Sequence, residues 1–448
     1  MSTLSSSEPR TWVTGWLKTH PFTVVGGVLL LLLAIVFCRR RDSEWEQVYL
    51  PAAGHLYKGE DVYRMGEGYL YPPFMAFTAL PFLALPAPLP RLLWFAVNAL
   101  CLLALLRWSW CVSGGGRLEG PENGKASERL AAVLGCLCGI SYLENCLAHQ
   151  QTDVVIGMML AAGCILLSRG RTMLAAAALG VAAACKCTAL LWAPYLLWRG
   201  RPLAAVWLVA VAIGLNLLPD LIQPAPEARF WLEEYVGRFL KPLTASDHYI
   251  GTWASDAVYN QSLTGLGRRW CLTSWTWEPT DCTVGPRSPL LRPQMLRVWV
   301  YGVELGILIA VLWMCGRPFR SLGEDTDGSR LALECSMVLL LMVLLSPMSS
   351  KAHFGTLVLP GFCLARAALS PRSAGLRSGR FLKGLLAAAV VLGLLCNKDP
   401  LGERLYTLSL WYGVVTWQTL LLLAACLIIY RNPPSVASCP PQTTADCE

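Results

Sequence analysis

Residues 344–360 read LLSPMSSKAHFGTLVLP: an apolar run, a short polar break and a second apolar run. The same alternation fills most of the 448-residue chain, in which 55% of the residues are hydrophobic, 15% are charged and the mean hydropathy is +0.47. A soluble globular protein usually carries about 25% charged residues, so this composition excludes a water-soluble multidomain enzyme. The sequence predicts an all-α polytopic membrane protein built as one helix bundle.

The apolar runs predict about twelve membrane spans, because a crossing helix needs about 20 mostly apolar residues. The runs lie at 21–38, 89–107, 130–147, 152–168, 172–186, 187–198, 203–220, 295–315, 331–348, 354–369, 381–396 and 406–430. The stretch 73–88 is apolar but interrupted by prolines, so we expect it to be re-entrant or interfacial.

We expect a transmembrane domain over 21–430, with long outer loops at 39–88 and 221–294. The N-terminal segment 1–20 is predicted to be cytoplasmic. The Pro-rich polar tail 431–448 is predicted to be cytoplasmic and disordered.

The basic residues predict the orientation. If the N-terminus is cytoplasmic, the short inner segments hold nearly twice as many Lys and Arg as the short outer segments. The run Arg39–Arg41 is the one clear exception. The net charge of +8 is therefore explained by topology, with no nucleic-acid partner. We expect a multi-pass protein of a bacterial inner membrane, with both termini cytoplasmic.

Most of the 18 cysteines lie inside apolar runs, where Cys behaves as a small hydrophobic residue. No CxxC pair has a second pair nearby, so the sequence predicts no metal site. Cys271 and Cys282 share one polar loop, and whether they form a disulfide depends on the compartment that the loop faces. There is also no GxxxxGK[ST], GxGxxG, HExxH or GxSxG motif, so ATP and nicotinamide chemistry have no support.

Five polar clusters interrupt the apolar pattern, and the predicted topology places all of them on the outer face. They are 42–49, 149–153, Lys186, 259–262 and 349–353. Polar groups at membrane depth are costly and usually mark a functional site. Together they predict an extracytoplasmic cavity.

Each cluster also has a structural interpretation. Glu44 and Glu46 either supply a carboxylate base or balance the preceding arginines in a solvated loop. The 149–153 segment either binds sugar hydroxyls through Gln151 and Asp153 or forms an ordinary polar turn. Lys186 either binds a phosphate or extends to the membrane interface.

The later clusters also have both a functional and a structural interpretation. His353 and Lys351 lie at the edge of an apolar span next to a Ser-Pro break, which packing alone explains poorly. Asn260 and Gln261 either bind substrate or cap a helix. Arg268 either binds an anionic head group or anchors the chain at the interface.

Taken in order, these segments resemble glycosyltransferase family 87, the polyprenol-phosphate-mannose-dependent mannosyltransferases of the GT-C class. The first block of matching residues is Glu44/Glu46, Val48-Tyr49, Ala52-Ala53, Gly59 to Tyr63, and Tyr71-Pro72-Pro73. The second block is Gln150 to Asp153, Lys186-Cys187-Thr188, Asn260-Gln261-Ser262, and Ser346-Pro347 with His353. The matches span roughly residues 42–360.

The resemblance implies a GT-C-type helix bundle that transfers a sugar from a polyprenyl-phosphate donor without a metal or cofactor. It implies a catalytic base in the first outer loop and a histidine near the reaction centre, here His353. The expected aspartate is not cleanly matched, because the neighbourhood reads Asp42-Ser43-Glu44-Trp45-Glu46; Glu44 is the first choice for the base, Glu46 the second and Asp42 the third. Gln150 stands where the family has Gly.

The predicted reaction moves a hexose, taken as mannose, to a lipid or glycan acceptor on the extracytoplasmic face. Glu44 deprotonates the acceptor and His353 orients a substrate. The cations that neutralise the donor phosphate are Lys186, Arg268 and Lys351. The residues that bind the substrates are Tyr49, Tyr71, Gln151, Asp153, Asn260 and Gln261. Three alternatives stay open at this point: a lipid or sugar transporter or flippase, a catalytically silent homologue, and a non-catalytic membrane scaffold.

Overall fold

The computed structural model describes residues 21–39, 43–64, 68–116, 118, 126–227, 229–244, 257–274, 285–286, 293–316, 328–370 and 377–431. The predicted cytoplasmic segment 1–20, the third candidate base Asp42 and the possible disulfide partner Cys282 lie outside these residues. So does the predicted tail after residue 431.

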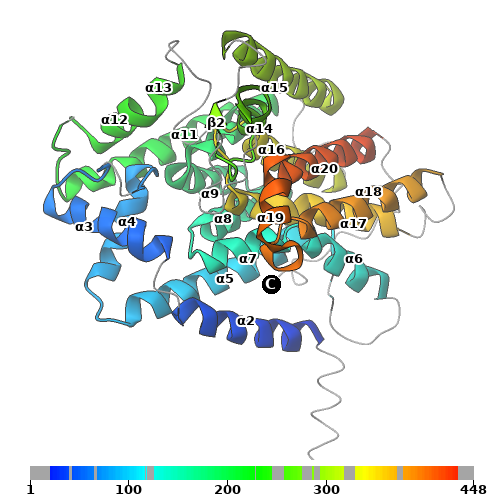
Figure 1. The fold of residues 1–448 in the computed structure, drawn as a ribbon, viewed down its shortest axis with the longest axis horizontal. Coiled ribbons are helices and arrows are strands. Elements are labelled where there is room, and N and C mark those ends of the chain that lie inside the picture. Colours follow the sequence, from blue (N-terminus) through cyan, green and yellow to red (C-terminus); the bar gives the residue numbers. More distant parts are fainter. Residues whose placement is uncertain are drawn as a thin grey trace, which may run out of the picture.

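Helices dominate the described residues, as the sequence predicts (Figure 1). The first third contains α2 (Pro21–Arg39), the π-helical turn η1 (Trp45–Tyr49), α3 (Leu50–Lys58), α4 (Pro73–Leu83) and α5 (Leu89–Val112). The middle contains α6 (Ala126–Leu137), α7 (Ile140–Ala148), α8 (Asp153–Ser168), α9 (Thr172–Cys185), η2 (Cys187–Leu191), α10 (Trp192–Trp198), α11 (Pro202–Asn216) and η3 (Leu218–Leu221).

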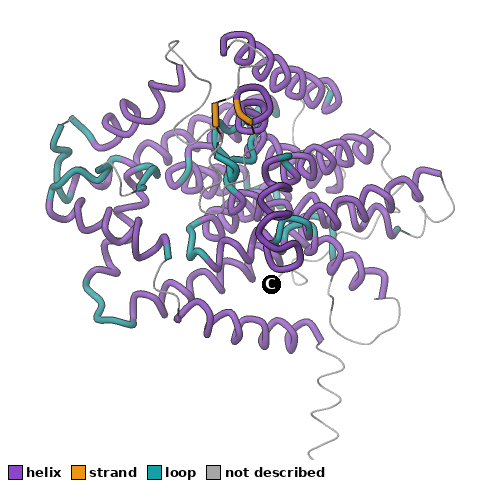
Figure 2. Tube along the Cα trace, in the orientation of Figure 1, coloured by secondary structure: helices purple, strands orange, loops and turns teal. Residues whose placement is uncertain are grey.

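The described part of the predicted loop 221–294 contains short elements. They are α12 (Trp231–Tyr235), η4 (Val236–Leu240), α13 (Lys241–Thr244), α14 (Leu263–Leu272), and the two-residue strands β1 (Thr273–Ser274) and β2 (Gly285–Pro286). Figure 2 shows this antiparallel pair in orange among the helices. The last third contains α15 (Pro293–Cys315), α16 (Gly328–Leu344), η5 (Lys351–Leu357), α17 (Val358–Leu369), α18 (Arg377–Leu394), α19 (Lys398–Trp411) and α20 (Val414–Arg431).

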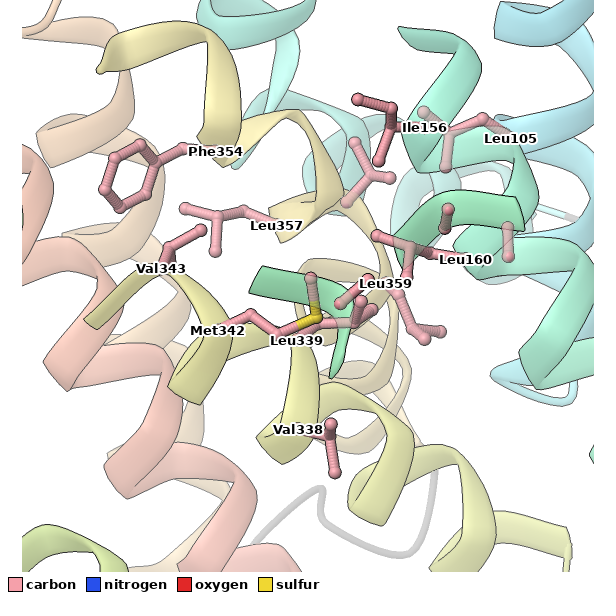
Figure 3. Packing of buried hydrophobic residues seen from close by; sticks show 14 of the residues in the cluster. Leu105, Ile156, Leu160, Val338, Leu339, Met342, Val343, Phe354, Leu357 and Leu359 are labelled. Carbon is pink, nitrogen blue, oxygen red and sulfur yellow. The ribbon is translucent and has the colours of Figure 1, made fainter. Parts of the chain in front are cut away.

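Helix α16 lies at the centre of the core, where every residue from Leu331 to Leu344 is buried. Apolar residues surround this helix, and its one carboxylate in this stretch, Glu334, is buried in an ion pair with Arg199, so the helix has no face to offer water and becomes a central element. Figure 3 shows Leu339 and Met342 of α16 beside Leu160 of α8 and Leu357 of η5. This core holds the start of α8 and the segment before α17 close together, and both carry polar clusters.

The outer helices expose apolar side chains. In α15, Val298 is 75% and Trp313 is 74% exposed, and Leu31 and Val36 of α2 are exposed too. Helix α2 runs along one edge of the molecule (Figure 1). Contiguous exposed apolar surface of this extent is typical of contact with another apolar phase. The apolar helices and their exposed apolar surfaces indicate a multi-pass membrane protein.

The predicted count of twelve spans is not confirmed. Among the described residues, five helices are long and apolar enough to cross a membrane, and seven if two bent pairs are each one span. Predicted span 130–147 is broken between α6 and α7, which bend by 53°. Predicted span 406–430 is split between α19 and α20, and α18 meets α19 at 89°. Five more apolar helices are shorter, including α4 within the predicted re-entrant stretch.

Candidate active site

The first loop and the α7–α8 turn meet directly, although they lie about one hundred residues apart in the sequence. The Glu44 amide donates to the His149 carbonyl at 3.1 Å, and the Gln151 side-chain amide donates to the Glu44 carboxylate. The Tyr49 hydroxyl lies 3.2 Å from the Thr152 hydroxyl. Two predicted site residues of the loop, Glu44 and Tyr49, are thus attached to the same polar turn.

A π-helical turn positions both residues. The Leu50 amide bonds to the Trp45 carbonyl, which is an i to i+5 bond. In an α-helix each residue rotates by about 100°, so positions five apart point in different directions. The wider π turn brings Glu44 and Tyr49 onto one side, and such turns occur frequently at functional sites.

Burial changes the acidity of Glu44, which lies outside the membrane-spanning segments. Removal from water raises its pKa above the ordinary value of 4.5. The bond from Gln151 opposes this rise, the negative charge of Asp153 adds to it, and Lys186 lowers the pKa again. A carboxylate with a raised pKa is better matched to a general base working near neutral pH.

Lys186 and Asp153 form a second part of the cluster. Lys186 follows α9 in an extended conformation, so its side chain leaves the helix end, and its Nζ lies 2.7 Å from Asp153 Oδ1. Nζ also lies 5.6 Å from the centre of the Tyr71 ring, which in turn packs on Tyr49 at 5.0 Å. Asp153 Oδ2 is buried and has no hydrogen-bond partner within the described residues.

His353 reaches the same place from η5. A small cavity is lined by Asp153, Lys186, Thr188, Ser349 and His353, together with apolar residues of α8 and α16. Its free volume is about 20 Å³, room for roughly one water molecule. A hexose therefore requires these segments to move apart, or lies at the mouth of the cavity.

Glu46 occupies a different environment from Glu44. Its carboxylate pairs with the Arg91 guanidinium at the start of α5, and Arg91 Nε lies 3.0 Å from Glu46 Oε1. Trp45, between the two acids, stacks on Trp94 at 3.8 Å. Of the two acids only Glu44 contacts the polar turn, which favours the first choice for the base.

Asn260 and Gln261 are fully buried and act as connectors. Asn260 Oδ1 accepts from the Ser349 amide at 3.1 Å, and its Nδ2 donates to the Pro347 carbonyl at 3.2 Å. The Gln261 amide donates to the Ser349 carbonyl at 2.7 Å. These bonds hold the segment that carries Ser349 and His353. The side chains of Asn260 and Gln261 therefore stabilise a wall of the cavity without lining it.

Two further predicted cations lie apart from the cluster. Lys351 donates to Asn397 Oδ1 at 3.0 Å, on the other side of η5 from His353. Arg268 lies in α14, where no described contact links it to Lys186. Its neighbour Arg269 donates to the carbonyls of Ala257, Asn260 and Trp411 and so holds the loop in shape.

Three contributors lie in segments that the sequence analysis singled out but are not among the predicted catalytic and binding residues. Gln150 has φ of 55° and donates from Nε2 to the Phe37 carbonyl at 2.8 Å. This left-handed conformation explains why Gly suits the position. Thr188 and Ser349 line the cavity, and their places in the KCT and SPMSS segments were the available signals.

The structure also shows a contact between the segments 43–64 and 229–244. Asp61 of the G-x-D-x-Y segment pairs with Arg238 at 3.0 Å, and Arg238 pairs with Glu234 at 2.6 Å. This ion-pair group lies beside the ring of Tyr63. It attaches the long loop to the first loop.

Comparison with known proteins identifies the class. The family model described as glycosyltransferase family 87 matches residues 69–347, more than half of the chain. The chain belongs to glycosyltransferase family 87. It is therefore a membrane glycosyltransferase by family.

One solved structure with a related arrangement is the crystal structure of ArnT from Cupriavidus metallidurans bound to undecaprenyl phosphate. The identity is 14%, the match covers 92% of this chain and 78% of that chain, and the TM-score is 0.40. At this level of likeness, the bound lipid remains a property of ArnT. A search among curated proteins gives no match.

Proposed function

We propose that the chain transfers a hexose, taken as mannose, from a polyprenyl-phosphate donor to a lipid or glycan acceptor on the extracytoplasmic face of the membrane. The observation that carries the proposal is the meeting of Glu44, the Asp153–Lys186 pair and His353, which come from four separate segments. Lys186 and His353 line one cavity, and Glu44, an acid with a raised pKa, is bonded to Gln151 beside it; an acid, a cation and a histidine are the groups that such a transfer needs.

In the proposed reaction, Glu44 accepts the proton of the acceptor hydroxyl. The acceptor oxygen attacks the anomeric carbon while the bond from that carbon to the phosphate oxygen breaks. The leaving polyprenyl phosphate takes the bonding electrons, and Lys186 stabilises its charge. Groups held in place before the reaction stabilise developing charge without having to reorganise.

Asp153 sets the position of the Lys186 ammonium, because one of its carboxylate oxygens holds Nζ at 2.7 Å. The ammonium keeps two further N–H donors for a phosphate oxygen. Tyr71, beneath Nζ, and Gln151, bonded to Glu44, are suited to contact the sugar. His353 orients the acceptor or the phosphate.

The test is sugar transfer by the purified chain in nanodiscs, supplied with labelled polyprenyl-phosphate mannose and a membrane-lipid extract. The proposal expects transfer by the parent and none by Glu44→Gln at equal expression. Donor binding without transfer by either protein would identify a wrong sugar or acceptor, or a silent homologue.

The transporter alternative makes a different prediction about access. A transporter exposes its cavity to both sides of the membrane in turn. If the chain is a transferase, single cysteines placed at Thr188 and Ser349 should therefore react with an impermeant thiol reagent added to one side of the membrane, and not with reagent added to the other side. Labelling from both sides, together with no donor binding, would favour a transporter or flippase.

A further inference from the structure

Lys351 is a buried cation with no counter-ion beside it. Its residue exposure is 7%, and its Nζ makes one hydrogen bond, to Asn397 Oδ1 at 3.0 Å. The ring of Tyr406 lies 5.4 Å from Nζ. No carboxylate in the described part of the chain forms an ion pair with it. Burying an unpaired charge is costly, and the cost is usually offset by a partner of opposite charge.

The nearby acids do not supply that partner. Glu144 of α7 and Asp399 of α19 act on Lys351 across space, and both are exposed. Because these two acids are exposed and Asn397 is partly exposed, the cluster lies at the edge of the bundle. Solvent screening weakens the influence of exposed acids on a buried ammonium.

Asn397 is arranged in an unusual way for its position. It is the N-cap residue of α19, yet its side chain does not cap the helix. Asn is favoured at N-caps because its oxygen can accept from the first helical amides, and here that oxygen accepts from Lys351 instead. The Asn397 Nδ2 group and two N–H groups of Lys351 remain available as donors for an oxyanion.

Lys351 is separated from the candidate active site by η5 itself. It precedes His353 by two residues in a 3₁₀ turn, where residues three apart share a face. The two side chains therefore point to different sides of the same turn. A ligand held at Lys351 would lie next to the cavity without entering the site assigned to the donor phosphate.

We propose that Lys351 and Asn397 form a second phosphate-binding site, which holds the anionic head group of an acceptor lipid. The identification of this lipid as the acceptor rests on the function proposed above. The existence of the anion site does not.

The test measures binding of phosphatidylglycerol and of undecaprenyl phosphate to the purified full-length chain by native mass spectrometry. The informative variant is Asn397→Asp, which keeps the shape and places a carboxylate beside the ammonium. It should lower phosphatidylglycerol affinity roughly tenfold or more, and Lys351→Met should do the same. Lys351→Arg keeps the charge and should retain most of the affinity. Undecaprenyl phosphate affinity should not change in any of the three.

Several outcomes overturn the proposal. Unchanged phosphatidylglycerol affinity in Asn397→Asp means that Lys351 is only structural. A parallel loss of undecaprenyl phosphate means that Lys351 belongs to the donor site. Lys351-dependent binding of inorganic phosphate, with no binding of the lipid, means that the ligand is a free anion. If the parent fails to bind undecaprenyl phosphate but phosphatidylglycerol binding still depends on Lys351, the proposed function fails and the second site stands.

Discussion

Lys186 Nζ lies 2.7 Å from Asp153 Oδ1, and the two side chains are only 15% and 7% exposed. Such a pair contributes little net stability by itself, because both charges lose their water on burial. Its value lies in fixing a cation beside the cavity. The loss of either partner leaves the other charge buried and uncompensated.

We therefore expect Lys186→Met to lower the free energy of unfolding by about 3–5 kcal/mol. The double variant Asp153→Asn/Lys186→Met should recover most of that loss, because no isolated charge remains. Unfolding in detergent, followed by circular dichroism, measures both. Equal stability of the single and double variants would mean that the charges do not depend on each other.

The raised pKa of Glu44 gives a pH dependence of stability with a defined sign. Because burial favours the protonated form in the folded state, the stabilising contribution is present below the unfolded pKa and is lost as pH rises through the folded pKa. Glu44→Gln should remove this part of the pH profile. Unfolding measured from about pH 4 to about pH 8 compares the two proteins, and identical slopes would contradict the assignment.

The π-helical turn can be tested by removing one residue. Deletion of Gln47, which is exposed, should convert the turn to an α-helix and rotate Glu44 by about 100° relative to Tyr49. We expect transfer to fall by about a hundredfold or more, because misplacement of a catalytic group by about 1 Å already costs that much. Gln47→Ala is the matched control and should remain active. An active deletion variant would show that the turn does not position the acid.

Substitutions of Gln150 distinguish the effect of its backbone strain on stability from the effect of its side-chain hydrogen bond. Its φ of 55° is unfavourable for a residue with a Cβ atom by about 1–2 kcal/mol, and its side chain bonds to the Phe37 carbonyl. Gln150→Ala loses the bond and keeps the strain, whereas Gln150→Gly loses both. We expect the Gly variant to be about 1 kcal/mol more stable than the Ala variant. The reverse order, measured in denaturant, would contradict the strain.

Composition and order of motifs were enough to predict the helical membrane bundle, the family and the meeting of Glu44, Gln151, Asp153, Lys186 and His353. Local sequence could not decide whether Glu44 or Glu46 is the base, because the choice depends on the ion pair between Glu46 and Arg91 of a later helix. It also could not show that Asn260 and Gln261 point into a connecting loop. Span boundaries failed where helices bend, since apolar composition continues across the breaks at 138–139 and 412–413.

The central claim is that Glu44 is the base, and the most direct test compares Glu44→Gln with Glu46→Gln. Both variants remove one carboxylate from the same turn, so they differ only in which environment loses the charge. The measurement is transfer from labelled polyprenyl-phosphate mannose at saturating donor in nanodiscs. We predict that Glu44→Gln lowers the rate by about 10²-fold or more, while Glu46→Gln stays within about tenfold of the parent. Full transfer by Glu44→Gln, or a larger loss in Glu46→Gln, would contradict the assignment.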